Sequence, residues 1–198
     1  MTLDKIKEVS IKQFARLGYE GTALSLIADE VGIKKQSIYS YYQSKEDLFL
    51  KLTQEVFEHE NIYIASFVTQ NAGKSLPDVL YDFLIHYVLT YENDNEMKFW
   101  LRFSFFPPLP FFDRINQQVY AHLDSVAVLL DPLFEEAYTS GLLDSKVLKE
   151  DAITAYLSVL DGILVELFYG GMTRVNSRLK ASWTIYWRGI RNGEHIYD

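Results

Sequence analysis

The chain has 198 residues, a net charge of −8 and no cysteine, and 48% of its residues are hydrophobic while 23% are charged. This is the composition of a folded globular protein, and the lack of cysteine excludes disulfides, thiolate metal sites and cysteine nucleophiles. The sequence begins without an apolar leader and contains no uninterrupted apolar run of membrane-spanning length, so we expect a cytoplasmic protein that does not bind a membrane.

Apolar residues recur at three- and four-residue spacing over most of the chain, which predicts an all-α protein of about nine helices. The first helix is expected to begin after Thr2 and to end at Gly18. Thr22 is expected to cap a second helix that stops at Gly32. The buried face of the first helix is expected to consist of Ile6, Val9, Ser10, Phe14 and Leu17.

A third, short helix is expected over residues 34–42, with Ile38 and Tyr42 turned inward. The segment Ser44-Lys45-Glu46-Asp47 predicts a capping box at the start of a fourth helix. Helices are then expected over residues 76–91, 97–106, 111–138, 149–169 and 174–190.

Residues 26–38 have the spacing that a helix-turn-helix requires. Ala28 is small where two helices cross closely, and Gly32 can adopt the positive φ of the turn. Ile33 and Ile38 are expected to fill the angle between the helices. This geometry would present the outer face of the third helix to a DNA major groove.

The side chains expected on that outer face are donor-rich: Lys34, Lys35, Gln36, Ser37 and Ser40. Glutamine can pair with adenine through two hydrogen bonds, and lysine can donate to guanine acceptors. Tyr39, Tyr41 and Lys45 are expected near backbone phosphates. The sequence therefore predicts a nucleic-acid-binding surface that can read bases.

The distribution of charge agrees with this interpretation. Residues 1–52 contain eight basic and seven acidic residues, a net charge of +1, whereas the remaining residues carry −9. An acidic body behind a nearly neutral head would orient the head toward DNA and keep the body away from it.

Three motifs in the first quarter of the chain resemble the N-terminal domain of tetracycline-repressor (TetR) family regulators. They are Gly18-Tyr19-x-x-Thr22, Ile27-Ala28-x-x-Val31-Gly32-Ile33 and Ser37-Ile38-Tyr39-x-Tyr41-Tyr42-x-Ser44-Lys45-Glu46-Asp47-Leu48. The resemblance implies a DNA-binding head over residues 1–47, and a helical-bundle domain for ligand binding and dimerisation over residues 48–198. It also implies a homodimer that represses transcription from a palindromic operator on double-stranded DNA and responds to a small-molecule effector.

By position in these motifs, Thr22 and Tyr41 look like phosphate contacts, and Lys45 looks like a contact at the start of the fourth helix. Lys35 and Gln36, with Ser40, look like the base-reading face. Lys34, Gln36 and Tyr41 stand where the family often has serine, glycine and histidine, so the operator sequence is not implied by the resemblance.

The body is unusually aromatic, which suits either a cavity for a hydrophobic or aromatic effector or a well-filled core. The candidate pocket residues are Phe83, Tyr87, Trp100, Phe103, Phe106, Tyr120 and Tyr156.

The last two helices carry broad apolar faces, which could pair with a second copy of the chain or pack within one subunit. The candidate interface residues are Ile153, Leu157, Leu160, Leu164, Leu167, Leu179, Trp183, Tyr186 and Trp187.

No nucleophile elbow, phosphate-binding glycine loop or paired metal motif is evident, so we expect neither an enzyme nor a metal or other cofactor. Glu55 with His59, and Asp82 with His86, are single pairs one helical turn apart, and are expected to make surface contacts. The alternative function is a helical small-molecule-binding or adaptor protein whose helix-turn-helix is only structural. DNA affinity and its salt dependence would separate the two.

Overall fold

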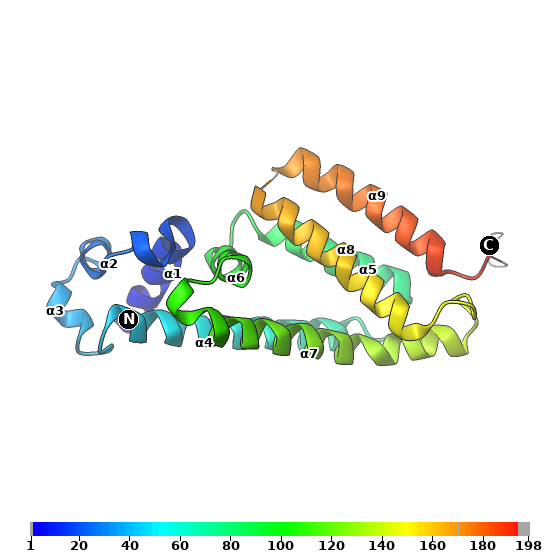
Figure 1. Ribbon diagram of the computed structural model, residues 1–198, viewed down its shortest axis with the longest axis horizontal. Helices are drawn as coiled ribbons and strands as arrows, with labels where there is room; N and C mark the ends of the chain where they lie inside the picture. Colours follow the sequence, from blue (N-terminus) through cyan, green and yellow to red (C-terminus); the bar gives the residue numbers. More distant parts are fainter. Residues whose placement is uncertain (1, 170, 194–198) are drawn as a thin grey trace. The chain divides into compact units, whose positions relative to one another are not determined.

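The computed structural model describes residues 2–169 and 171–193, and within these ranges it contains nine α-helices and no multi-residue strand (Figure 1). The predicted all-α fold and helix number are therefore confirmed. The helices are α1 (Thr2–Gly21), α2 (Leu24–Val31), α3 (Lys35–Ile38), α4 (Lys45–Gln70), α5 (Leu76–Thr90), α6 (Asn95–Phe105), α7 (Phe112–Thr139), α8 (Lys149–Tyr169) and α9 (Met172–Ile190), with a 3₁₀ turn, η1 (Leu109–Phe111), before α7.

The chain packs into two units. Unit 1 contains the residues up to Glu60 together with Tyr91–Tyr120, and unit 2 contains Asn61–Thr90 and the residues from Ala121 onward. The packing of unit 1 thus continues past the predicted domain boundary between residues 47 and 48. That boundary marks the end of the DNA-binding motif and stays a prediction.

The core of unit 1 is built from aromatic side chains on α1, α4 and α6. The rings of Phe14 and Phe49 lie 5.2 Å apart between centroids, and Phe103 lies 4.8 Å from Phe49 and 4.7 Å from Phe99. Such edge-to-face pairs add to the free energy gained by burying apolar surface. Leu17, which was predicted to be buried on α1, is instead 39% exposed because the helix breaks at the next residue.

The break in α1 lies at Gly18, where φ is 74° and ψ is 176°, a conformation that is almost restricted to glycine. The hydroxyl of Thr22 donates to the Gly18 carbonyl at 2.8 Å and to the Gln13 carbonyl at 3.1 Å. Arg102 of α6 donates to the Ala15 carbonyl at 3.2 Å. These side-chain donors bond to backbone carbonyls around the point where the helix is interrupted.

Unit 2 is organised around α5, α8 and α9, which pack against one another. Two buried tyrosines tie these helices together: the Tyr156 hydroxyl donates to the Leu80 carbonyl at 2.8 Å, and the Tyr186 hydroxyl donates to the Ala152 carbonyl at 2.9 Å. Within the described residues, α8 is long and apolar enough to cross a membrane by length and composition. Its apolar side chains supply the core of unit 2, as expected for the central helix of a globular unit.

Candidate nucleic-acid interface

The turn between α2 and α3 has the geometry that the sequence predicted. Gly32 adopts φ 83° and ψ 34°, and its N–H donates to the Ala28 carbonyl at 2.9 Å and to the Asp29 carbonyl at 3.2 Å. The N–H of Ile33 donates to the Ala28 carbonyl at 2.9 Å. A left-handed glycine that satisfies the last helical carbonyls is a common way to end a helix and redirect the chain.

The third helix is shorter than the predicted range 34–42. Regular helix extends only over Lys35–Ile38, and a turn continues it, in which the N–H groups of Tyr41 and Tyr42 both donate to the Ile38 carbonyl at 3.0 Å. Ile38 and Tyr42 are buried, as predicted. These two anchors hold the segment against the rest of unit 1, so its other face is presented to solvent.

The presented face carries most of the predicted DNA-binding side chains. Ser37 is half-buried, and the exposed residues are Lys34, Lys35, Gln36, Tyr39, Ser40 and Tyr41. Tyr39 and Tyr41 are 48% and 44% exposed, although tyrosine rings would gain free energy by burial. The surface therefore offers ammonium, amide and hydroxyl donors together with two aromatic rings.

Free positive charge in the head is concentrated on this face. Residues 1–52 contain eight lysines and arginines, and six of them are bonded to other groups of the protein. Lys7 pairs with Glu55 at 2.7 Å and Lys12 with Glu30 at 2.6 Å. The other four bonded residues are Lys5, Arg16, Lys45 and Lys51. Among the residues that the structure describes, Lys34 and Lys35 have no such partner, so their charge is available to phosphates or base edges.

Two residues predicted to contact DNA, Thr22 and Lys45, instead bond through their side chains to backbone carbonyls of unit 1. Thr22 is completely buried, and its hydroxyl is committed to the two carbonyls at the α1 break, so this side chain is not on the surface. The N-cap of α2 is Ala23 and has no side-chain hydrogen bond, so the predicted cap by Thr22 is wrong. Lys45 donates to the Tyr19 carbonyl at 2.9 Å, and its ammonium lies 4.1 Å from the centroid of the Tyr19 ring.

The start of α4 is capped nearly as the sequence predicted. The Ser44 hydroxyl accepts a hydrogen bond from the Asp47 N–H at 3.0 Å, which is one half of a capping box. The Asp47 carboxylate accepts from the Gln43 N–H at 2.9 Å, one residue earlier than the reciprocal bond of a capping box. This bond and the neighbouring Lys51 hold the pKa of Asp47 below its usual value. The cap fixes the point at which the chain leaves the exposed face for α4.

Sequence reasoning missed a polar network that joins α1 to α2. Gln13 is buried, and its side chain donates to the Glu30 carboxylate and accepts from Arg16 at 3.0 Å. Hydrogen bonds from Lys12 and Gln13 lower the pKa of Glu30. The available signal was a polar residue next to Phe14 on the buried face of an amphipathic helix, which predicts an internal partner.

Comparison with known proteins places the same stretch in a family. The family model of bacterial regulatory proteins, tetR family, matches residues 6–52. IcaR of Staphylococcus epidermidis, an HTH-type negative transcriptional regulator of the biofilm operon icaADBC, is 29% identical over 161 residues, which are 80% of each chain. Residues 6–52 of this chain are thus similar to the DNA-binding domain of the TetR family. IcaR of Staphylococcus aureus is 27% identical over 148 residues, which are 75% of this chain and 74% of that protein. The chain is a DNA-binding transcriptional regulator.

Solved structures share the fold of this chain over nearly its whole length. A TetR-family regulator from Agrobacterium tumefaciens superposes with a TM-score of 0.72 at 17% identity, covering 96% of this chain and 98% of that one. FadR from Bacillus subtilis, solved in complex with stearoyl-CoA, superposes with a TM-score of 0.65 at 18% identity, covering 92% and 98%. At these identities the likeness concerns the fold alone.

The aromatic residues predicted to line a pocket are divided between the two units. Phe103 and Trp100 are buried in unit 1, whereas Phe106 and Tyr120, also in unit 1, are 51% and 65% exposed. The other three are core residues of unit 2: Phe83, Tyr87 and Tyr156. The alternative of a well-filled core therefore describes the five buried members of the set.

The predicted dimer-interface residues are also mostly internal. Leu157, Trp183 and Trp187 are half-buried, and the remaining six are buried within the single chain: Ile153, Leu160, Leu164, Leu167, Leu179 and Tyr186. The Tyr186 hydroxyl bonds to α8, and the Trp183 ring lies 5.4 Å from that of Tyr81 on α5. These faces form the core of unit 2, so their prediction as a surface for a second copy is wrong for the six buried side chains.

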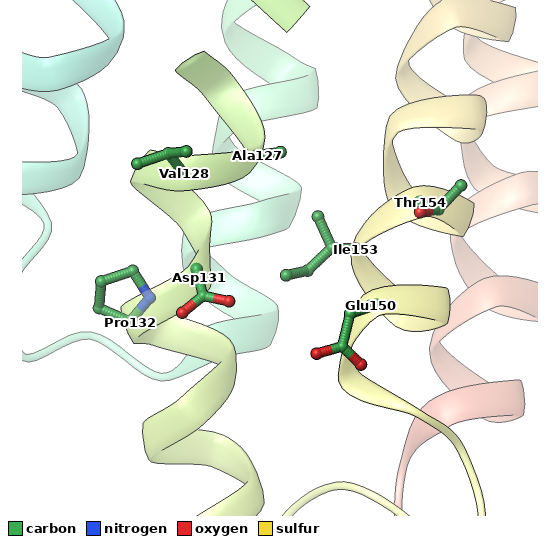
Figure 2. A pocket seen from close by; sticks show the side chains of 7 residues that line it. All are labelled: Ala127, Val128, Asp131, Pro132, Glu150, Ile153 and Thr154. Carbon is green, nitrogen blue, oxygen red and sulfur yellow. The ribbon is translucent and has the colours of Figure 1, made fainter. Parts of the chain in front are cut away.

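Two pockets lie among the described residues of unit 2, and neither of these two is lined by the predicted aromatic set. One, of about 430 Å³, lies between α7 and α8 (Figure 2). The other, of about 530 Å³, is lined by Tyr138, Gly141, Leu143, Asp144, Ser145, Lys146, Asn192 and Gly193. Both volumes are in the range of small-molecule sites.

No group of three metal-ligating side chains comes together within residues 2–169 and 171–193. The two carboxylate–histidine pairs seen in the sequence are separated by other partners. His59 contacts the Glu96 carboxylate at 3.0 Å, and Asp82 pairs with Lys74 at 2.9 Å. His86 stacks on the Tyr63 ring, with centroids 4.0 Å apart. These histidines take part in contacts between helices.

Proposed function

We propose that this TetR-family regulator is a cytoplasmic repressor that binds a palindromic operator as a homodimer and is controlled by a small-molecule effector. The observation that carries the DNA-binding part is the exposed face that begins at Lys34 and ends at Tyr41. It places the two unpaired lysines of the head beside an exposed glutamine, Gln36, on a segment anchored by two buried side chains. Lysine charge supplies affinity, and the amide supplies a means of base discrimination.

Repression is supported by the relatives. The IcaR proteins of Staphylococcus epidermidis and Staphylococcus aureus are negative transcriptional regulators, and the similarity extends well beyond the DNA-binding head. A protein that occupies an operator can block transcription without any catalytic group.

Dimerisation is supported by the low DNA affinity expected of a single head and by the outer faces of α8 and α9. Two copies can read half-sites one DNA turn apart, about 34 to 36 Å, and so gain the affinity that one short recognition helix lacks. On α9, Ile185 is 70% exposed. Ala181 and Gly189, one helical turn before and after Ile185, are exposed as well, and α8 carries small exposed residues of its own: Ala155, Ser158 and Gly162. This outer surface, opposite the buried face that was first predicted, would let the helices of two copies approach closely.

Effector control is supported by the pockets of unit 2, both large enough for a small molecule. The similar FadR of Bacillus subtilis is a regulator solved with a ligand, stearoyl-CoA. An effector can shift the regulator between states that differ in the spacing of the two heads only if it binds those states with different affinity.

The test is fluorescence anisotropy with the DNA that flanks the regulator's own gene, measured over a range of salt concentrations. We expect the logarithm of the affinity to fall linearly with the logarithm of the salt concentration, and the double variant Lys34→Ala, Lys35→Ala to lower that slope by about two. Lys146→Ala, which removes an exposed lysine of unit 2, should leave the slope unchanged. A slope that the double variant does not alter would favour a helix-turn-helix with a purely structural role.

A further inference from the structure

The groove between α7 and α8 combines an apolar surface with two carboxylates. Its volume is about 430 Å³, and Figure 2 shows Asp131 on α7 and Glu150 on α8 at opposite sides, with Ile153 between them. The apolar part of the lining comes from both helices: Ala127, Val128, Pro132 and Ile153. Thr154 completes the lining. The groove therefore suits a molecule with an apolar body and one polar group.

The charge around the groove selects the sign of that polar group. Lys149 is shared between two carboxylates, Asp131 at 2.9 Å and Glu135 at 2.8 Å. Among the described residues Glu150 has no ion pair, so three carboxylates face one ammonium at this position. A cation that enters the groove meets net negative charge, whereas an anion is repelled.

Pro132 leaves one carbonyl of the helix that forms one wall without its usual donor. Pro132 lies inside α7, and proline has no N–H to donate to the carbonyl one turn earlier, which belongs to Val128. Both residues line the groove. An ammonium group has donors and no acceptors, so it complements a carbonyl without its usual helical partner as well as the carboxylates.

We infer that the α7–α8 groove is the effector site and that the effector is a small amphiphilic organic cation. Its apolar body lies on Ile153, Val128 and Pro132, and its ammonium lies between Asp131 and Glu150. This inference rests on the proposed effector control. Thr154 is exposed on α8, the helix whose outer face carries Ala155 and Ser158, so an occupied groove lies next to the surface proposed for pairing with a second copy.

The test uses three probes with one apolar body and different charges: phenylbutylamine, phenylbutanol and phenylbutyrate. Their dissociation constants for the full chain are measured by calorimetry at low salt, without DNA. We expect the amine to bind at least about ten-fold more tightly than the alcohol, a difference of about 1.4 kcal/mol, and the carboxylate to bind more weakly than either. Glu150→Gln should reduce the preference for the amine several-fold, whereas Glu136→Gln, an exposed α7 acid outside the groove, should not.

The unfolding temperature of each variant shows that it is folded, and Asp131→Asn provides a second removal of charge from the opposite wall. Equal binding of the amine and the alcohol, or an unchanged preference in Glu150→Gln, would overturn the inference. So would loss of dimerisation in Glu150→Gln together with no binding of the amine to the wild type, since a second copy would then occupy the groove.

The link to regulation is read separately, by adding the amine to the operator complex. A change in operator affinity that Glu150→Gln suppresses is the expected result, and amine binding without such a change would refute the effector assignment. Failure of the proposed function itself would be recognised without any probe, as absence of specific operator binding by the wild type.

Discussion

Replacing Gly18 with alanine should destabilise unit 1 through two separable effects. Gly18 has φ 74° and ψ 176°, a region in which a residue with a Cβ is strained by about 1–3 kcal/mol. An added Cβ would also lie 3.0 Å from Nη2 of Arg102, so the guanidinium must move. Its movement would weaken the 3.2 Å hydrogen bond to the Ala15 carbonyl, which contributes about 1 kcal/mol at this half-exposed position. The expected loss is about 2–4 kcal/mol.

Urea unfolding of Gly18→Ala, Arg102→Ala and the double variant separates the two effects. The double variant should be more stable than the sum of the single losses predicts, by about 1 kcal/mol, because the contact can be lost only once. Gly141→Ala is the matched control, since Gly141 also has a positive φ of 77° but an added Cβ would meet nothing within 4 Å. Strictly additive losses, or a loss in Gly18→Ala no larger than in Gly141→Ala, would show that the contact between position 18 and Arg102 does not contribute.

Burial lowers the pKa of His122 to about 4 from an ordinary value near 6.5, so its contribution to stability is present above pH 6.5 and is lost as the pH falls toward 4. Urea unfolding should therefore show a lower free energy of unfolding at pH 5 than at pH 7.5, and His122→Gln should reduce this difference. Lys45→Met should lower the free energy of unfolding by about 1 kcal/mol without changing the salt dependence of operator binding, because the ammonium is bonded to Tyr19. If the slope of log affinity against log salt concentration falls by about one, Lys45 is a phosphate contact instead. Ile185→Asp should raise the dimer dissociation constant, measured by sedimentation, at least ten-fold, whereas Leu89→Asp, at an equally exposed position on α5, should not. Equal effects of the two substitutions would show that Ile185 does not lie in the dimer interface.

The features that sequence predicted well are those set by the backbone of a few neighbouring residues. Gly32 adopts the positive φ expected of it, α1 breaks at Gly18 where its end was predicted, and the Ser44 hydroxyl caps α4. The exposed face of α3 followed from the spacing of Ile38 and Tyr42, since two buried anchors fix the orientation of a short segment. Local stereochemistry is encoded within a few residues, so it can be read without knowledge of the fold.

The features that sequence could not settle depend on partners far away in the chain. Periodicity predicts that α8 and α9 each have an apolar face, but it does not show which surface buries that face. In the structure most of these apolar side chains are buried within unit 2 itself. Phe103 could have lined a cavity, but Phe49, more than fifty residues earlier, packs against it. Lys45 likewise could have reached a phosphate, but its ammonium donates to the Tyr19 carbonyl. A side chain's length and chemistry define what it can contact, and the tertiary structure selects among those contacts.

Base reading by the exposed face of α3 is best tested at Gln36, whose amide lies on that face. The measurement is the ratio of affinities for the operator and for the same DNA with one half-site scrambled, at fixed salt. We expect Gln36→Ala to lower this discrimination by about 1–3 kcal/mol, and Gln43→Ala, which replaces an exposed glutamine just beyond the face, to leave it unchanged. Unchanged discrimination in Gln36→Ala, with the wild type still specific, would contradict the assignment of base reading to this face.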